Sequence, residues 1–189
     1  MTGSKFCVCV LRNATVYGLS KRRMRFDLIV NMMTLHAWKN NRIIVMGGGK
    51  QWRPLVHIND VIQAFRLIIL AKERDVNEQI FNVGSNSQNY QVFQVSNFFK
   101  KFFPSLIVEV APDDTDPRSY HVKFDKIQKG LKFECQYQIE HGIKEIKTAL
   151  ENGEITDHIS TNTGWYYKYL IDADQLLTKV KIDNKLFSI

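Results

Sequence analysis

Arg53 has the setting in this sequence most suggestive of chemistry, because it follows a run of glycines at positions 47–49. Glycine adopts backbone angles that other residues resist, so the run predicts a tight hairpin between two strands. Leu55, Val56 and Ile58 come next and predict a short buried strand. A guanidinium held at such a junction can bind a planar anion through two parallel hydrogen bonds. The stretch therefore predicts an anion-binding arginine, and the alternative is a surface salt bridge.

The residues after this strand are expected to open a helix. Asn59 and Asp60 carry side-chain oxygens that can accept hydrogen bonds from the amides of a first helical turn. Apolar residues then recur at helical spacing and predict the face that packs on the core: Val61, Ala64, Phe65, Ile68 and Ile69.

Composition limits the class of protein and of partner. The chain has 189 residues, 44% of them apolar, which suits one domain, or one domain and a subdomain. A formal charge of +7 favours nucleic acid, acidic lipid headgroups or phosphorylated small molecules, and charge alone does not choose among them. Basic residues are densest at residues 21–25, where we interpret them as a solvated helix entrance rather than a nucleic-acid patch.

Cysteines and apolar runs indicate the compartment. Cys7 and Cys9 are too close for an ordinary disulfide and lack the spacing of a metal site, so they and Cys135 are predicted to be small core residues in a reducing compartment. No apolar run approaches the ~20 residues that span a bilayer, and the N-terminus lacks a signal-peptide pattern. We therefore expect a cytoplasmic protein with no membrane partner and no metal.

The expected elements alternate between strand and helix. Residues 6–11 are continuously apolar, which is typical of a strand buried on both faces of a parallel sheet. Only five residues precede them, so the chain is expected to begin in the middle of a fold. Further strands are predicted at residues 43–46, 80–84 and 106–110, and helices at residues 24–39, 92–103, 125–130, 139–150 and 164–177.

Three islands in this order resemble one family. They are L-R-N-A-T-V-Y-G at residues 11–18, G-G-G-K-Q-W-R-P-L-V-H-I-N-D at residues 47–60, and F-N-V-G at residues 81–84. A weaker fourth island joins D-P-R-S at residues 116–119 to F-D-K-I at residues 124–127. The set is similar to the C-terminal half of NAD-dependent epimerase/dehydratases, the extended short-chain dehydrogenase/reductases that act on nucleotide sugars, and the resemblance covers roughly residues 8–150.

The resemblance implies an α/β fold. Residues 1–153 would be the C-terminal remainder of a Rossmann-like doubly wound sheet with a small mixed α/β substrate-binding subdomain. Residues 154–189 would be a helical extension and tail. The family's cofactor is NAD(P), and its substrate diphosphate is held in the cleft between sheet and subdomain.

The resemblance also implies site residues. Arg53 matches the arginine that contacts the diphosphate, and Arg118 matches the second arginine that closes over it. Two guanidiniums on separate loops suit a doubly charged group, and the alternative for each is a surface salt bridge. The other positions carried over are Asn82, Thr15, Asp27 and Leu28 for the substrate, and Asn13 and Ala14 for the cofactor.

This sequence departs from the family pattern near the substrate. Thr15 replaces the usual asparagine, Leu19 replaces a common proline, and Asp27 is acidic where a phosphate would be near.

The family's cofactor loop and catalytic pair are also missing. No glycine-rich loop opens a helix, and Lys50 is not followed by Ser or Thr, so positions 47–50 are not a phosphate loop. Tyr17 and Lys21 have the family's Tyr-x-x-x-Lys spacing, but Gly18 argues against the helix that would bring them together. His57 lies in an apolar strand and is interpreted as a core histidine. We therefore predict no catalytic residue in this chain.

Three hypotheses remain. In the first, the chain is the nucleotide-sugar-binding part of a sugar epimerase or dehydratase, as a fragment, a split-enzyme half that pairs with a chain carrying the N-terminal half, or a truncated relative, with a homodimer as the other possible assembly. In the second, it is a basic module for RNA or an anionic surface, although nucleic acid is not the expected partner. In the third, it completes the sheet of another chain.

Overall fold

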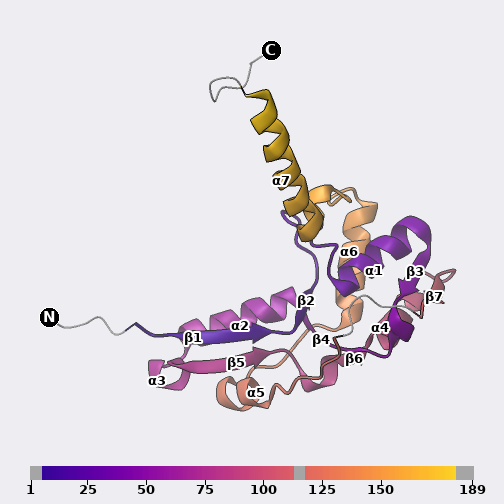
Figure 1. Cartoon of the computed structure of the whole chain (residues 1–189). Coiled ribbons are helices and arrows are strands. Elements are labelled where there is room, and N and C mark those ends of the chain that lie inside the picture. The colour runs from indigo at the N-terminus through magenta and orange to yellow at the C-terminus, as the bar shows by residue number, and fades with distance from the viewer. Residues whose placement is uncertain (1–5, 113–117, 182–189) are drawn as a thin grey trace.

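The structure is a computed structural model that describes residues 6–112 and 118–181, in which short sheets and helices form two connected lobes (Figure 1). The strands are β1 (Cys9–Asn13), β2 (Thr15–Tyr17), β3 (Arg42–Val45), β4 (Trp52–His57), β5 (Gln79–Val83), β6 (Asn89–Gln91) and β7 (Ile107–Val110). The helices are α1 (Ile29–Asn40), α2 (Ile58–Leu70), α3 (Glu73–Val76), α4 (Val92–Phe98), α5 (Asp125–Leu131), α6 (Ile139–Glu151) and α7 (Thr163–Val180).

Parallel pairing dominates the sheets. β1 pairs with β5, β2 with β4 and β3 with β7, all parallel, while β6 joins β4 antiparallel. Helical connections between the parallel strands follow from this topology, because parallel strands need long crossovers. The predicted α/β class with a Rossmann-like partial sheet is confirmed.

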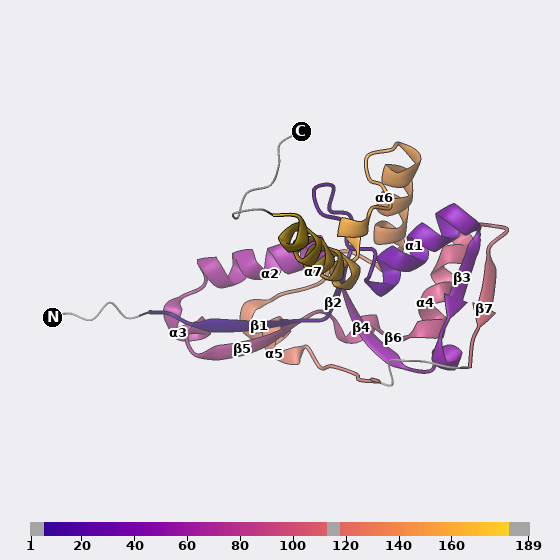
Figure 2. The ribbon, with the colours of Figure 1, turned by 45° about the horizontal axis from the view of Figure 1, so that its top comes forward.

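The first lobe is a layer of β1 and β5 between two helices. Figures 1 and 2 both show α2 on one side of this layer and α5 on the other. Their apolar side chains meet those of β5 in one core cluster, in which Ala64, Phe81, Val83 and Ile127 are almost fully buried.

β1 is more exposed than its sequence predicts. Val8 and Val10 each keep 43% of their surface exposed, and Phe6 keeps 85%. Within the described residues β1 pairs only with β5, so one edge and part of one face have no neighbour. A strand is present but begins at Cys9, so Phe6 and Val8 precede it. The prediction that both faces of the strand are buried is wrong. Cys7 is also exposed, contrary to its predicted place in the core.

The second lobe packs α1, α4 and α6 around β3 and β7. Its core includes Val30, Met33, Val45, Phe99 and Ile143, all almost fully buried. α6 matches its predicted range closely, and Ile143, Ile146 and Leu150 are buried as expected. α1 begins at Ile29 rather than near residue 24, because the backbone is extended at Leu28. Before it, Arg25 is hydrogen-bonded to Asp27, and the Phe26 amide donates to the Thr161 carbonyl.

The glycine run is a compact turn but joins no hairpin. Gly47–Gly49 form a single 3-10 turn with φ between 60° and 69°. A Cβ at Gly49 would lie 2.6 Å from Val45 Cγ1 and 2.8 Å from Phe93 Cβ, so the packing requires glycine there. β3 and β4 flank the turn but belong to different sheets, so the predicted hairpin is wrong.

The start of α2 is capped by a residue other than those predicted. The Nδ1 atom of His57 accepts a hydrogen bond from the Asn59 amide at 3.2 Å. Asp60 is instead fully buried and accepts hydrogen bonds from the backbone amides of Gln136 at 2.8 Å and Tyr137 at 3.2 Å. The buried face of the helix is narrower than predicted, because Phe65 and Ile69 are exposed.

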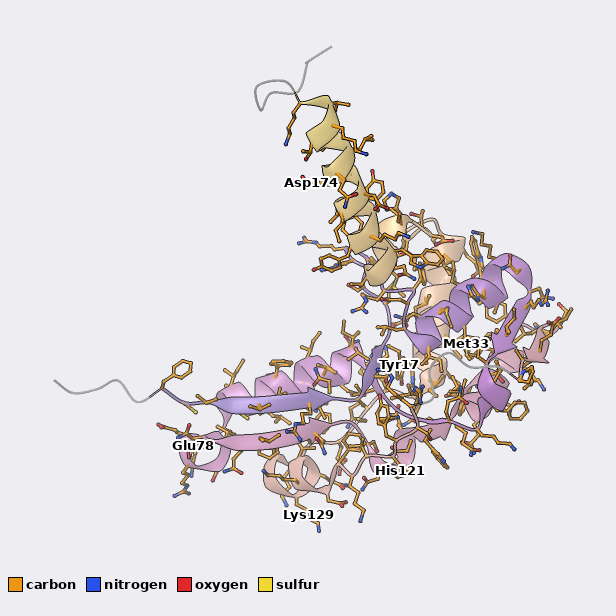
Figure 3. The ribbon with its side chains drawn as sticks, viewed as in Figure 1. Tyr17, Met33, Glu78, His121, Lys129 and Asp174 are labelled. Atoms are coloured by element: carbon orange, nitrogen blue, oxygen red, sulfur yellow. The ribbon has the colours of Figure 1, made fainter. Side chains whose placement is uncertain are left out.

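α7 stands away from the body of the molecule. It covers the predicted helix at residues 164–177 and has no buried residue over its 18 positions. Figure 3 shows its side chains, including Asp174, standing clear of the two lobes. The proposed boundary between residues 153 and 154 stays a prediction. Over residues 6–112 and 118–181, no helix is both long and apolar enough to cross a membrane.

Candidate anion-binding site

A cavity of about 350 Å³ brings together five of the predicted site residues. We call it the arginine cavity. The predicted residues in its lining are Thr15, Asp27, Leu28, Arg53 and Arg118. They come from β2, the entrance of α1, β4 and the segment after residue 117, so four parts of the chain meet there.

Arg53 is held in place by the strand that carries it and by the segment that carries Arg118. Its Nη1 donates a hydrogen bond to the carbonyl oxygen of Trp52 at 2.9 Å and another to the carbonyl oxygen of Arg118. Its guanidinium carbon lies 5.7 Å from the centroid of the Tyr120 ring, a cation–π distance. The half-buried guanidinium therefore has a fixed position at the cavity wall.

The Arg118 segment is docked on β4. The Trp52 amide donates to Ser119 Oγ at 3.0 Å, and the Tyr120 amide donates to the Trp52 carbonyl at 3.3 Å. These contacts bring the two arginines from positions far apart in the sequence to one cavity. Asp116 and Pro117, which begin the fourth sequence island, lie outside the described residues.

Asp27 is acidic although it lies where the diphosphate of the predicted substrate would bind. The structure shows how the charge of its carboxylate is compensated. Arg25 donates to both carboxylate oxygens of Asp27 at 2.8 Å, and the Thr163 amide donates at 3.2 Å. Partial burial is the largest single effect and would raise the pKa of Asp27, but the hydrogen bonds from Arg25 and Thr163 outweigh it and hold that pKa below its usual range. The carboxylate is therefore already paired.

The remaining predicted residues lie outside this cavity. Asn82 Nδ2 donates to the Lys123 carbonyl at 3.2 Å. Asn13 is exposed at the end of β1, and Ala14 is buried against Val83 of β5. All three lie at or next to the carboxyl ends of the parallel pair β1 and β5, the edge where open α/β sheets bind ligands.

The cavity lining contains residues that the sequence did not single out. They are Ile29, Met32, Met33, Ile44, Met46, Gln51, Val92 and Tyr120. Tyr120 follows Arg118 by two positions and contacts Arg53, so its aromatic character beside a predicted phosphate arginine was an available signal. The methionines gave no such signal, because apolar residues at helical spacing predict packing in the core rather than a cavity wall.

Tyr17 and Lys21, which have the spacing of a catalytic pair, do not meet in the structure. Tyr17 is 1% exposed and its hydroxyl donates to Gln88 Oε1 at 3.2 Å, while Lys21 pairs with Glu154 at 2.6 Å, so the Tyr-x-x-x-Lys spacing forms no pair. Burial raises the pKa of Tyr17 far above its usual value. Figure 3 places Tyr17 in the interior of the molecule.

His57 is also structural. It is fully buried, lies 2.8 Å from Glu145 Oε1 through Nε2, and stacks on Tyr137 with ring centroids 4.5 Å apart. The interpretation of His57 as a core histidine is confirmed. Among residues 6–112 and 118–181 no group of three His, Cys, Asp or Glu side chains could hold a metal ion.

Comparison with known families supports the motif resemblance. The sequence model of the NAD dependent epimerase/dehydratase family matches residues 2–84. This range contains the first three sequence islands and most of the arginine cavity's strands.

Solved structures share the fold. An NAD-dependent NDP-hexosamine 5,6-dehydratase involved in tunicamycin biosynthesis is 21% identical, with a TM-score of 0.64, over 77% of this chain and 46% of its own. An epimerase from Methanothermobacter thermautotrophicus is 16% identical, with a TM-score of 0.67, over 78% and 44%. The UDP-glucuronic acid 4-epimerase from Bacillus cereus, solved with UDP-glucuronic acid and NAD, is 17% identical, with a TM-score of 0.65, over 76% and 45%.

The TM-scores show a shared fold, and at these low identities the likeness is one of fold alone. The chain spans less than half the length of each of these structures. The sequence islands, the matched family model and the fold agree with one another. The chain therefore resembles the NAD-dependent epimerase/dehydratase family in both sequence and structure, and it carries part of the fold of these proteins.

Proposed function

We propose that this chain is the part of an NAD-dependent nucleotide-sugar epimerase or dehydratase that binds the substrate diphosphate. The observation that carries the proposal is the meeting of Arg53 and Arg118 at one cavity, where the first guanidinium donates to the backbone of the second arginine. Two guanidiniums suit a diphosphate, because each can make charge-assisted hydrogen bonds worth about 1.5 to 3 kcal/mol.

The other walls suit the rest of a nucleotide sugar. Leu28, Met32, Met33 and Val92 offer apolar surface, while Thr15 offers a hydroxyl. The pairing of Asp27 with Arg25 leaves the cavity without an uncompensated acid at that wall. An anion can therefore approach Arg53 without strong repulsion from Asp27.

Hydride chemistry is proposed to lie outside the described residues. Nucleotide sugar and NAD are bound together in the Bacillus cereus epimerase, and NAD would supply hydride transfer in an enzyme of which this chain is a part. The glycine turn offers no cradle for its phosphates, because it joins strands of two sheets instead of opening a helix and Gly49 is packed against Val45 and Phe93. Tyr17 is buried and hydrogen-bonded. We therefore assign no catalytic step to this chain and propose that it is inactive alone.

A second polypeptide segment is proposed to lie beside β1. Two-stranded parallel sheets are normally covered on both faces, and here Val8, Val10 and Ile80 are each at least 42% exposed. This exposure supports a partner that carries the N-terminal half of the fold, with a homodimer as the alternative assembly. The free cysteines accord with the cytoplasm as the proposed location.

The test is calorimetric titration of the chain with UDP-, dTDP- and GDP-sugars. We expect one of them to bind, and Arg53→Ala or Arg118→Ala to weaken it about tenfold or more. Arg66→Ala, at an exposed position of α2, is the matched control and should leave the affinity unchanged. Equal affinities for wild type and Arg53→Ala would reject the proposal. Turnover of a nucleotide sugar by this chain with NAD would reject the part that places catalysis elsewhere.

A second candidate is a module that binds RNA or an anionic surface, and α7 favours it. Trp165, Tyr167 and Tyr169 are 70%, 61% and 52% exposed, and exposed rings can stack on bases. This function predicts binding to single-stranded RNA that weakens steeply with salt and that Arg53→Ala does not alter. Binding of nucleotide sugars without RNA binding would exclude it.

A further inference from the structure

A second cavity, of about 730 Å³, lies at the base of α7 and shares no lining residue with the arginine cavity. We call it the basic-loop cavity. One wall is the loop at residues 21–24, the opposite wall is the segment at residues 153–161, and Tyr166 of α7 completes it. The densest basic stretch of the sequence is solvated, as expected, and it also lines a cavity.

Positive charge at this cavity is only partly compensated. Lys21 pairs with Glu154 at 2.6 Å. Arg22 and Arg23 are exposed, and neither makes a hydrogen bond or ion pair with its side chain within the described residues. The lining therefore holds two guanidiniums whose charges no carboxylate of this part of the chain balances, and an anion between them would relieve their mutual repulsion.

The floor of the basic-loop cavity is apolar. Met24 and Ile155 are 3% and 6% exposed and belong to a core cluster with Ile146 and Leu150 of α6. Tyr166, half-buried at the start of α7, adds an aromatic ring. A ligand that places an anionic group at the arginines would therefore find apolar surface for the rest of the molecule.

The two walls are fixed relative to each other by hydrogen bonds. The Phe26 amide donates to the Thr161 carbonyl at 2.8 Å, which joins the basic loop to the opposite segment. That segment is braced internally, since Thr161 Oγ1 donates to the His158 carbonyl at 2.6 Å and the Ser160 amide donates to His158 Nδ1 at 3.2 Å. A preformed cavity binds a ligand with little ordering of the protein.

We infer that the basic-loop cavity binds a small molecule that carries a phosphate or pyrophosphate group together with an apolar or aromatic part. Arg22 and Arg23 contact the anionic group, while Tyr166, Met24 and Ile155 contact the remainder. The volume is in the range of ligand pockets. This site is separate from the diphosphate site proposed at Arg53 and does not depend on it.

The experiment uses the full chain carrying Arg53→Ala, so that the arginine cavity does not contribute. Inorganic pyrophosphate and adenosine diphosphate are titrated separately at constant ionic strength, and amide resonances are followed by NMR. We expect saturable shifts at residues 153–161, and about tenfold tighter binding of the nucleotide because its base adds a stacking contact.

Arg22→Gln with Arg23→Gln is expected to weaken both ligands about tenfold or more. Arg12→Gln with Arg66→Gln, at exposed positions of β1 and α2, removes the same charge elsewhere and should leave binding unchanged. Three results would each overturn the inference: no saturable shift, equal loss in the control pair, or equal shifts produced by sodium chloride. Equal affinity for pyrophosphate and nucleotide would overturn the assignment of an apolar part. Failure of nucleotide-sugar binding at Arg53 would leave these outcomes unaffected.

Discussion

Arg53 donates a hydrogen bond from Nη1 to the backbone carbonyl oxygen of Arg118, so the two arginines of the arginine cavity are joined although they lie 65 positions apart in the sequence. The bond is accepted by the backbone carbonyl of Arg118 rather than by its side chain. One arginine is thus held in a strand while the other is carried by an irregular segment docked on that strand. Both arginines are therefore attached to β4, one through the strand itself and the other through the contacts of its segment.

Arg53→Lys is expected to weaken nucleotide-sugar binding about tenfold while the chain stays folded. Lysine keeps the charge but loses the planar guanidinium that makes two parallel hydrogen bonds. Its single ammonium group cannot bind the ligand and also donate to the Arg118 carbonyl as the guanidinium does. Calorimetry measures the affinity, and circular dichroism checks the fold. Unchanged affinity would show that charge alone, rather than bidentate contact, is used at this position.

Asp27→Asn is expected to lower the free energy of unfolding at pH 7 by about 1 to 3 kcal/mol, because a charge-assisted contact to Arg25 is lost. The pKa of Asp27 is lowered in the folded chain. Its stabilisation is therefore complete above the ordinary value of 3.8 and is lost as the pH falls through the lower folded pKa.

Urea unfolding at pH 7 and at pH 3 measures this dependence. The difference between wild type and Asp27→Asn should shrink at the lower pH. Asp157→Asn serves as the control, since it removes an exposed contact to Lys39 and should cost less than about 1 kcal/mol. A difference of the same size at both pH values would contradict the role of the Asp27 charge.

Gly142→Ala is expected to destabilise the fold by about 1 to 3 kcal/mol. A Cβ there would lie 2.6 Å from Tyr17 Cδ2, and Tyr17 is fully packed, so a neighbour must move. Gly130→Ala is the matched control, because its Cβ would lie 3.7 Å from the nearest atom, in Phe81. This second change should be neutral or stabilise by up to about 1 kcal/mol. Thermal unfolding distinguishes them, and equal effects would contradict the close packing of α6 on Tyr17.

A chain that ends at Gly164 is expected to keep cooperative unfolding, with a midpoint temperature lowered by no more than about 4 °C. α7 buries no residue, so its removal takes little apolar surface out of the core. Differential scanning calorimetry measures the change. Loss of the cooperative transition would show that α7 contributes to the core.

The local sequence pattern correctly predicted those elements that pack against other elements of this same chain. α6 has its apolar residues at helical spacing, and these pack on α1 within the described residues, so its range and buried face were predicted correctly. Arg53 could be placed because the strand that carries it is apolar and central, between β2 and β6. Periodicity is sufficient where the neighbours are in the same sequence.

Other features depended on contacts that periodicity does not carry. The apolar run at residues 6–11 predicted a strand buried on both faces. A strand is buried only by the elements beside it, and within the described residues β1 pairs only with β5. His57 caps α2 because its ring is fixed by Glu145 and Tyr137, which lie about 80 or more positions further along the chain. The basic-loop cavity arises from a long-range contact between residues 21–24 and 153–161, which no local pattern reveals.

The hydrogen bond from the Thr163 amide to Asp27 fixes the first turn of α7, while no residue of the helix is buried. One end is anchored at the wall of the arginine cavity and, through Tyr166, at the basic-loop cavity, while the rest of the helix touches no core. An α-helix rises about 1.5 Å per residue, so these 18 residues reach about 27 Å, and a tilt of about 10° at the anchor would displace the far end by about 5 Å. A change in the direction of α7 at either cavity would thus displace its exposed, aromatic-rich surface most at the end far from the anchor.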